Sequence, residues 1–182
     1  FMSGTSSDAS GVVENSEQIN PLHNNSSAKK VLQKVNKRAA SNSTRNIQIT
    51  GVSRLDPINT PESSKIGLSL ELAQNARIGN GTIYTKYYKV NKGVIDTKNI
   101  EELSPDDEYD KYVAFYDPKS VKKEKNKITI TADTIGGRYR GAMAQIPKDK
   151  VDYMDLNPSA IFGESATLIP FSNHNDGNRM LM

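Results

Sequence analysis

Residues 82–90 read TIYTKYYKV, and no other run restricts the fold of this chain as strongly. The run is rich in β-branched and aromatic residues that alternate with polar ones, a pattern typical of a half-buried β-strand. The letters NKG at 91–93 then predict a hairpin turn. The later runs YVAFYD, KITITAD and AMAQI also have sequence patterns typical of β-strands. A small mixed β-sheet is therefore predicted between residues 81 and 150. The run DPKSVKKEKNK at 117–127 is expected to be an exposed loop between strands.

The region before the strands predicts a short helix and a loop. Ser26 or Ser27 could cap a helix that continues to about Ala40. The small polar letters SNSTRN at 41–46 then predict a loop that leads toward a proline-containing segment.

Two further helices are predicted, one before the strands and one after them. The first covers about 65–77, with Ser63 or Ser64 as its N-cap and glycines beyond its last residue. Gly67 inside this helix would cost about 1 kcal/mol relative to Ala, so a closely packed neighbour is expected there. The second is predicted to begin near Asp176.

These elements predict an α+β fold with irregular helical elements around a small mixed β-sheet. Four parts are expected: a flexible lead-in over 1–16, a helical region with a basic stretch over 17–80, a strand-rich insertion over 81–150, and a closing loop and helix over 151–182. Only 35% of the 182 residues are apolar, which is thin for a self-sufficient domain of this length. Two interpretations are open: some of the apolar surface is meant for a partner, or some of the length is disordered when the chain is alone.

The composition excludes several classes of site. The absence of cysteine excludes disulfides, thiolate catalysis and cysteine-ligated zinc. The two histidines, His23 and His174, are too far apart in sequence to have metal-site spacing. No run of about 18 apolar residues exists, so no membrane span is expected, and a cytoplasmic location is favoured.

The positive charge is concentrated in one interval. The net charge is only +3, but no acidic residue lies between Glu17 and Asp56. Lysine and arginine side chains without interspersed acids form either a solvated face or a surface that attracts nucleic-acid phosphates, and both interpretations are open. The basic residues of this interval are Lys29, Lys30, Lys34, Lys37, Arg38, Arg45 and Arg54.

Arg179 lies where the first turn of the last predicted helix should be. A cation at this position opposes the helix dipole. Such local conflicts are more frequent at functional positions, which suggests an arginine directed at an anion beside free backbone N–H groups. The alternative is a surface arginine that tolerates its place.

Three stretches, taken in order, resemble the β subunit, or second-largest subunit, of multisubunit DNA-directed RNA polymerases. They are INPLHNNSSAKKVLQKV at 19–35, SRLDPINTPESSKIGLSLELAQNARI at 53–78 (the Thr-Pro-Glu block), and VDYMDLNPSAIFGESATLIPFSNHNDGNRMLM at 151–182. Where the family has cysteine and glycine, the Thr-Pro-Glu block has Asp56 and Ser63. The departures leave the fine geometry of this block open.

The resemblance implies a fork and rifampicin-pocket region beside the active centre of a nucleotidyltransferase that is not active alone. Implied partners are the remaining β-subunit portion, the largest (β′-type) subunit, template DNA, nascent RNA and ribonucleoside triphosphates. Mg²⁺ is implied as a cofactor held by the largest subunit, not by this chain. The chain is then expected to be either an excerpt of a β subunit or a separately made piece of a divided β subunit of the bacteriophage type. The second alternative would place the protein in the bacterial host cytoplasm or in a virion.

The resemblance also implies roles for single residues. Arg179 is expected to contact the phosphates of the incoming nucleotide, with Asn178 and Asp176 shaping the pocket, and His174 is expected to be structural. Glu62 is expected to support the mobile catalytic loop of the largest subunit. The residues expected to face nucleic acid are Lys29, Lys30, Lys37, Arg38, Arg45 and Arg54, of which Arg54 is also expected to brace the Thr-Pro-Glu block.

The rifampicin pocket gives a further expectation. Glu17, Ser27 and Leu32 stand where sensitive enzymes have Asp, His and Ser. The changes remove hydrogen-bond partners worth roughly 1 to 1.5 kcal/mol each and add bulk, so rifampicin resistance is expected.

A rival interpretation is a non-enzymatic nucleic-acid-binding module. Its basic stretch would bind phosphates, and Tyr84, Tyr87 and Tyr88 would stack on bases. Tyrosines in strands are more often half-buried packing residues.

Overall fold

The computed structural model of the protein describes residues 19–33, 35, 40–124 and 127–181. Its helices and strands, in chain order, are α1 (Pro21–Ala28), β1 (Lys30–Leu32), α2 (Asn42–Arg45), η1 (Ile49–Gly51), β2 (Ser69–Glu71), β3 (Ala76–Gly79), β4 (Thr82–Asn91), β5 (Val94–Leu103), α3 (Pro105–Glu108), β6 (Val113–Ala114), β7 (Val121–Glu124), β8 (Lys127–Ile130), β9 (Thr134–Tyr139), β10 (Ala142–Pro147), η2 (Lys148–Lys150), β11 (Tyr153–Asp155), α4 (Glu164–Thr167), η3 (Ser172–His174) and α5 (Gly177–Leu181).

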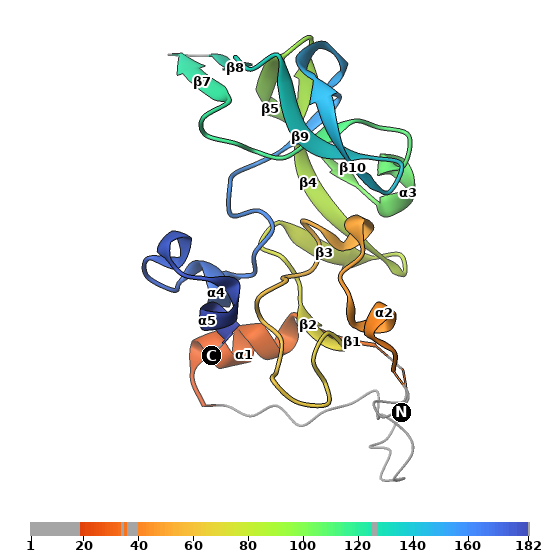
Figure 1. Ribbon diagram of the computed structural model, residues 1–182, viewed down its shortest axis with the longest axis vertical. Helices are drawn as coiled ribbons and strands as arrows, with labels where there is room; N and C mark the ends of the chain where they lie inside the picture. Colours follow the sequence, from red (N-terminus) through yellow and green to blue (C-terminus); the bar gives the residue numbers. More distant parts are fainter. Residues whose placement is uncertain (1–18, 34, 36–39, 125–126, 182) are drawn as a thin grey trace.

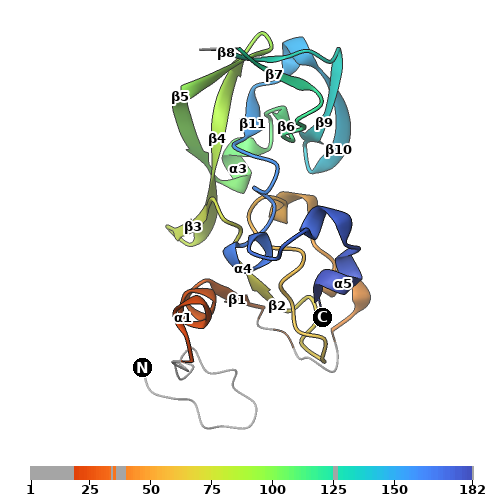
Figure 2. The ribbon, with the colours of Figure 1, turned by 90° about the vertical axis from the view of Figure 1, so that its left-hand side faces the viewer.

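The molecule is elongated and has two parts along its long axis (Figure 1). The strand-rich part, residues 76–155, forms one end. The loop-rich part, residues 19–73 and 156–181, contains the β1–β2 pair and the short helices, and it forms the other end. A view turned by 90° shows the same division, with α1, α4 and α5 gathered in the loop-rich part (Figure 2).

The nine strands of the strand-rich part form one sheet. Its order is β10-β9-β6-β11-β4-β5-β8-β7, and β3 pairs with β4 beside this path. The β11–β6 pair is parallel and the other pairs are antiparallel, so the sheet is mixed. The predicted α+β class with a mixed sheet is confirmed. The sheet starts earlier and ends later than predicted, because β3 begins at Ala76 and β11 ends at Asp155.

Tight turns with left-handed backbone join three of the hairpins. The predicted NKG turn is confirmed, because Lys92 and Gly93 have φ values of 47° and 77° between β4 and β5. Positive φ at both central residues matches the right-handed twist of the flanking strands. The other two turns of this kind are Asn80-Gly81 between β3 and β4 and Arg140-Gly141 between β9 and β10.

The main apolar core lies within the strand-rich part. Its fully buried members come from strands at both ends of the sheet order, so the sheet curves around them. They are Val90, Ile95, Ala114, Ile130, Ile135, Ile146, Val151 and Met154.

The predicted exposed loop over 117–127 is wrong in part. Its second half contains β7, which pairs with β8 and places Val121 opposite Ile130. Val121 packs against the core, and this apolar contact stabilises a strand in a lysine-rich run.

The predicted helix from Ser26 or Ser27 to Ala40 is also wrong. Asn20 caps α1 by accepting the N–H of His23 at 2.7 Å, and α1 ends at Ala28. Val31 then pairs with Leu70 in the β1–β2 ladder, so sheet pairing replaces helix after Lys29. The predicted loop at 41–46 instead contains the one-turn helix α2, capped by Ser41.

The predicted helix over 65–77 is wrong as well. Residues 64–68 form turns, and β2 and β3 follow. Leu68, Leu70 and Leu72 recur at every second residue and are all buried, which fits extended backbone. The close neighbour predicted at Gly67 is confirmed. Its φ is 69°, and a side chain there would overlap the carbonyl of Arg45.

Candidate functional site

Four buried polar side chains join the strand-rich part to the loop-rich part, and we call them the buried charge cluster: Arg54, Tyr87, Glu108 and Arg138. Glu108 Oε2 accepts a hydrogen bond from Arg54 Nη2 at 2.7 Å, and its Oε1 accepts one from Arg138 Nε at 2.5 Å. Tyr87 donates its hydroxyl to Glu108 Oε2 at 3.0 Å. One carboxylate therefore forms ion pairs with two arginines, one from each part of the chain.

The electrostatics of the cluster follow from burial and charge pairing. Burial alone would raise the pKa of Glu108, but the two arginines outweigh it and hold the pKa below its usual value. Burial also raises the pKa of Tyr87 well above that of a free phenol. Glu108 is ionised and Tyr87 is neutral at physiological pH.

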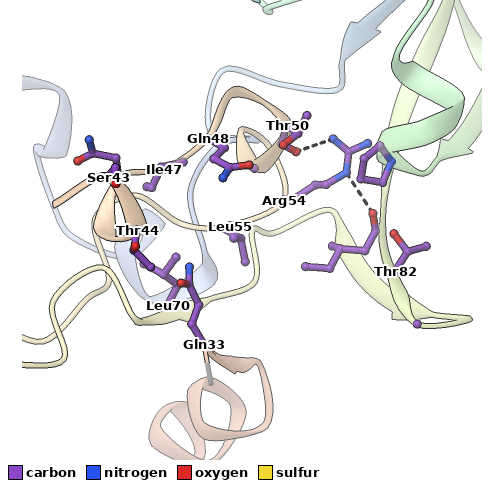
Figure 3. A pocket seen from close by; sticks show the side chains of 15 residues that line it. Gln33, Ser43, Thr44, Ile47, Gln48, Thr50, Arg54, Leu55, Leu70 and Thr82 are labelled. Atoms are coloured by element: carbon purple, nitrogen blue, oxygen red, sulfur yellow. Dashed lines mark hydrogen bonds between the residues drawn. The ribbon is translucent and has the colours of Figure 1, made fainter. Parts of the chain in front are cut away.

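The guanidinium of Arg54 is buried and already hydrogen-bonded within the protein, so it is not accessible to a phosphate. Its side chain is 2% exposed and also donates to the carbonyls of Thr50, Ile83 and Leu103 at 3.0 to 3.2 Å. Figure 3 shows the guanidinium at the edge of a cavity of about 680 Å³, where it donates a hydrogen bond to the carbonyl of Thr50. The nucleic-acid-binding prediction for Arg54 is therefore wrong in this fold, because the guanidinium is buried and fully engaged.

Two buried carboxylates organise the loop-rich part. Asp56 is fully buried, and its oxygens accept the backbone N–H groups of Ile58 at 2.7 Å and Gly163 at 2.8 Å. A side chain on Gly163 would approach Asp56 Oδ2 to 2.8 Å, so glycine is required there. The departure from the family at Asp56 therefore has a structural role, which is to hold the segment before α4 against the Thr-Pro-Glu block.

Glu71 is the second of these carboxylates and is 3% exposed. Its Oε2 accepts hydrogen bonds from the hydroxyls of Ser26 at 2.8 Å and Ser165 at 3.4 Å, and from the Asn59 amide. We call these four residues the Glu71 cluster. Sequence reasoning missed Glu71, although a lone acid between Leu70 and Leu72 is an indication of a paired or hydrogen-bonded buried group.

Glu62 lies in an exposed turn of the Thr-Pro-Glu block. Just before it, Thr60 donates to the carbonyl of Ser69 at 3.0 Å and accepts the N–H of Gly67 at 3.0 Å, which fixes the turn to β2. Arg45 donates to two carbonyls on the far side of the same turn, those of Ser64 and Ile66, at 2.9 and 2.8 Å. The backbone around Glu62 is thus clamped from both sides.

Arg179 is exposed in the first turn of α5, as predicted. The helix begins where expected, because the carbonyl of Asp176 accepts the N–H groups of Arg179 at 3.0 Å and Met180 at 3.2 Å. The backbone of Asn178 belongs to the same helix. Ahead of it, Phe171 adopts left-handed backbone with a φ of 56° while 77% of its surface is exposed.

The Thr-Pro-Glu block and α5 meet at one contact. A Cβ atom on Gly177 would lie 3.8 Å from Cδ1 of Ile58. Ile58 stands between Asp56 and Asn59, which take part in the two polar arrangements described above. The segment that carries Glu62 therefore adjoins the helix that carries Arg179.

The remaining basic residues have different surroundings. Lys29 forms an ion pair with Glu164 at 2.5 Å, which holds α1 to α4 and lowers the pKa of Glu164 through the hydrogen bond. Lys30 is exposed at the start of β1. Lys37 and Arg38 lie outside the described residues.

The tyrosines named for base stacking do not form a common exposed surface. Tyr87 is fully buried in the buried charge cluster, whereas Tyr84 and Tyr88 are half-buried. The guanidinium of Arg77 lies 4.9 Å from the centre of the Tyr84 ring.

One of the three rifampicin-pocket positions lines a polar cavity of about 390 Å³. Ser27 contributes to its wall together with Lys30, Pro61 and Glu71. Leu32 is 52% exposed, and Glu17 lies outside the described residues.

Over residues 19–33, 35, 40–124 and 127–181, no group of three His, Asp or Glu side chains could hold a metal ion. No helix within the same ranges is long and apolar enough to cross a membrane.

Two family models match this chain, in the order of its two parts. Residues 14–78 match the model for RNA polymerase Rpb2, domain 3, and residues 87–156 match the RNA polymerase beta subunit external 1 domain. The matches cover the Thr-Pro-Glu block and most of the sheet.

Relatives with the name DNA-directed RNA polymerase subunit beta agree with these models. The protein of Treponema pallidum is 40% identical over 140 residues, which is 76% of this chain and 11% of the relative. That of Bdellovibrio bacteriovorus is 42% identical over 139 residues, or 76% of this chain and 10% of the relative. The chain thus spans about a tenth of the relatives it matches, and it belongs to the family of DNA-directed RNA polymerase β subunits.

Proposed function

We propose that this chain forms part of the active-centre wall of a DNA-directed RNA polymerase and takes part in nucleotidyl transfer only within a complex. Its partners in this proposal are the remaining portion of the β subunit and a largest subunit. Template DNA, nascent RNA and ribonucleoside triphosphates are the substrates, and the complex acts in the cytoplasm. In this proposal the Mg²⁺ for the reaction is held by the largest subunit.

The exposed Arg179 at the start of α5 is the observation that carries the proposal. Its guanidinium projects from a helix that the Thr-Pro-Glu block contacts, and it is not committed to any hydrogen bond seen among the described residues. A guanidinium presents several N–H donors in a plane, which suits the phosphates of an incoming nucleotide. Charge that develops on the departing pyrophosphate would be stabilised by such a fixed cation.

Glu62 and the basic residues have supporting roles in this proposal. Glu62 supports the mobile catalytic loop of the largest subunit from a turn that Arg45 and Thr60 hold in place. Lys30 faces nucleic acid from the start of β1, and Lys37 and Arg38 belong to the same basic stretch. Asn178 and Asp176 shape the nucleotide pocket beside Arg179.

The rival function, a stand-alone nucleic-acid-binding module, has less support. Stacking on bases needs exposed aromatic faces, and Tyr87 is fully buried while Tyr84 is covered by Arg77. Arg54, the last residue of the basic interval, is buried in an ion pair.

The proposal is tested by Arg179→Ala in the polymerase assembled with this chain. Loss of a charged hydrogen-bonding group should raise the apparent KM for ribonucleoside triphosphates about 10- to 100-fold while the subunits still assemble. Arg140→Ala is the matched control, because Arg140 is another exposed arginine, which lies in the turn between β9 and β10 and pairs with Asp110. An unchanged KM in the assembled Arg179→Ala enzyme would refute the nucleotide role.

Rifampicin provides an independent test of how the stretch at 19–35 was aligned. Ser27 lines the polar cavity and stands where sensitive enzymes have histidine. The short serine hydroxyl does not reach as far as a histidine ring, so it cannot replace the hydrogen bonds of that ring. We expect the assembled enzyme to keep its activity at micromolar rifampicin. Inhibition at those doses, measured by transcript synthesis, would contradict the alignment.

A further inference from the structure

Glu71 bonds to three separate segments of the loop-rich part. Ser26 belongs to α1, Asn59 to the Thr-Pro-Glu block, and Ser165 to α4. The backbone carbonyl of Glu71 also accepts the N–H of Asp56 at 2.8 Å. A single residue of β2 therefore bonds to segments that lie up to 94 positions away from it.

The Glu71 cluster connects to α5 through two short steps. The Asn59 amide bonded to Glu71 follows Ile58 directly in the chain, and Ile58 adjoins the first residue of α5, Gly177. Arg179 is two residues further on, in the first turn. Ile58 lies beside the start of α5, its own N–H is donated to Asp56, and the residue after it, Asn59, is bonded to Glu71.

We propose that Glu71 is a positioning residue for nucleotide addition, which holds the start of α5 so that Arg179 reaches the phosphates of the incoming nucleotide. The inference rests on the proposed function. Three donors with no cation among them converge on one oxygen of a buried carboxylate, a costly arrangement that packing alone does not require. Small misplacements of a group that stabilises the transition state cost much of its effect.

The two carboxylate oxygens of Glu71 differ in the number of hydrogen bonds they accept, and this difference makes the proposal testable. All three donors approach Oε2, whereas Oε1 is buried without a hydrogen-bond partner in the described structure. In Glu71→Gln the amide can turn so that its carbonyl oxygen takes the Oε2 position. Its NH₂ group then takes the Oε1 position, where no other donor faces it. The hydrogen bonds from Ser26, Asn59 and Ser165 to the carbonyl oxygen therefore persist.

The experiment compares three variants of the assembled polymerase. Glu71→Ala should raise the apparent KM for ribonucleoside triphosphates about tenfold, because α5 loses its support. Glu71→Leu fills the same space without accepting hydrogen bonds and should give the same rise. Glu71→Gln should stay within about twofold of the unchanged enzyme. A packing role would leave both Glu71→Leu and Glu71→Gln close to the unchanged enzyme, because both fill the space of Glu71, and that result would overturn the inference.

The path through Arg179 is tested by a double-mutant cycle. Once Arg179→Ala is present, adding Glu71→Ala should change KM by less than about twofold, because the arginine that Glu71 positions is gone. Independent, multiplying effects would overturn the inference. Glu102→Ala serves as the control, since Glu102 is an acid of the same size that pairs with Arg77 in the sheet.

The two proposals fail in different ways. If Arg179→Ala alone leaves KM unchanged, the proposed function is wrong. If Arg179→Ala raises KM but Glu71→Ala only lowers the amount of assembled enzyme, the function stands and the positioning role is wrong.

Discussion

The strand-rich part and the loop-rich part use different interactions to hold their shape. The first is built on continuous backbone ladders around a core that includes Val90, Ile95 and Met154. The second has few regular elements, and buried side-chain oxygens of Asp56 and Glu71 bond its loops instead. A ladder spreads its free energy over many equivalent bonds, whereas a loop held by one carboxylate depends on that residue. The loop-rich part should therefore respond to single polar substitutions that the sheet tolerates.

The largest expected effect comes from breaking the connection between the two parts. Glu108→Ala leaves Arg54 and Arg138 buried without their shared carboxylate, which should cost about 3 to 5 kcal/mol of stability. Hydrogen exchange of the assembled protein should show faster exchange in both parts, because both arginines lose their partner. Glu108→Gln keeps one acceptor and should lose less. Faster exchange in the sheet alone would mean that the cluster does not couple the two parts.

A pH-dependent effect should follow from Asp155 at the end of β11. Burial raises the pKa of Asp155 to about 6, and Arg138 only partly offsets it. Between about pH 4 and 6 the folded chain binds a proton that the unfolded chain has released, so stability falls as the pH rises through this window. Above pH 6 the ionised carboxylate of Asp155 lowers the free energy of unfolding by about 3 kcal/mol.

Asp155→Asn should remove this dependence. The variant should be more stable than the unchanged protein at pH 7.5 and no more stable at pH 4, as measured by urea unfolding. Equal stability differences at both pH values would contradict the raised pKa.

A smaller, local effect is expected for Asp56→Asn. Both carboxylate oxygens of Asp56 accept backbone N–H groups, so an asparagine must oppose one of them with its own NH₂. We expect a loss of about 1 to 3 kcal/mol, confined to the loop-rich part and visible as faster exchange of the Gly163 amide. Unchanged exchange would show that Asp56 does not hold this segment. Glu71→Gln is expected to have little effect, because only one oxygen of Glu71 accepts hydrogen bonds. Asp56→Asn is expected to be harmful, because both oxygens of Asp56 accept them.

The smallest expected effect lies on the surface of the sheet. Glu102→Ala removes an ion pair with Arg77, whose side chain is half exposed. Solvent-exposed pairs contribute little, because water already satisfies both charges. No measurable change in the thermal midpoint is expected. A clear loss would mean that the sheet also depends on single polar residues, and the distinction between the two parts would fail.

Local patterns made the sheet predictable. The β4–β5 hairpin could be read from alternation and the NKG turn, because both signals lie within the hairpin itself. The strand at Ser69–Glu71 was missed because a serine cap and a leucine-rich run also fit a helix. The period of two at Leu68, Leu70 and Leu72 was the better indication, and β1 pairing decided it.

The candidate site was predictable only where its signal was local. The start of α5 and the place of Arg179 followed from capping residues and from the family motif. The partners of Arg54, Glu71 and Asp56 lie 54, 94 and 107 residues away, and no periodicity in the sequence indicates which distant groups will meet. Burial of a charge is decided by tertiary packing, which a single sequence does not reveal.

The position of β11 has a consequence for the order of assembly. Among the described residues, β11 is the last strand in sequence, yet it lies in the middle of the sheet, between β6 and β4. No other strand in that part of the chain joins the β10-β9-β6 half to the β4-β5-β8-β7 half. Before residues 153–155 are available, the chain holds two separate hairpin systems with open edges. Closure of the sheet is thus a late, long-range event, and a ribosome-bound chain that stops short of β11 should remain open to protease between its halves.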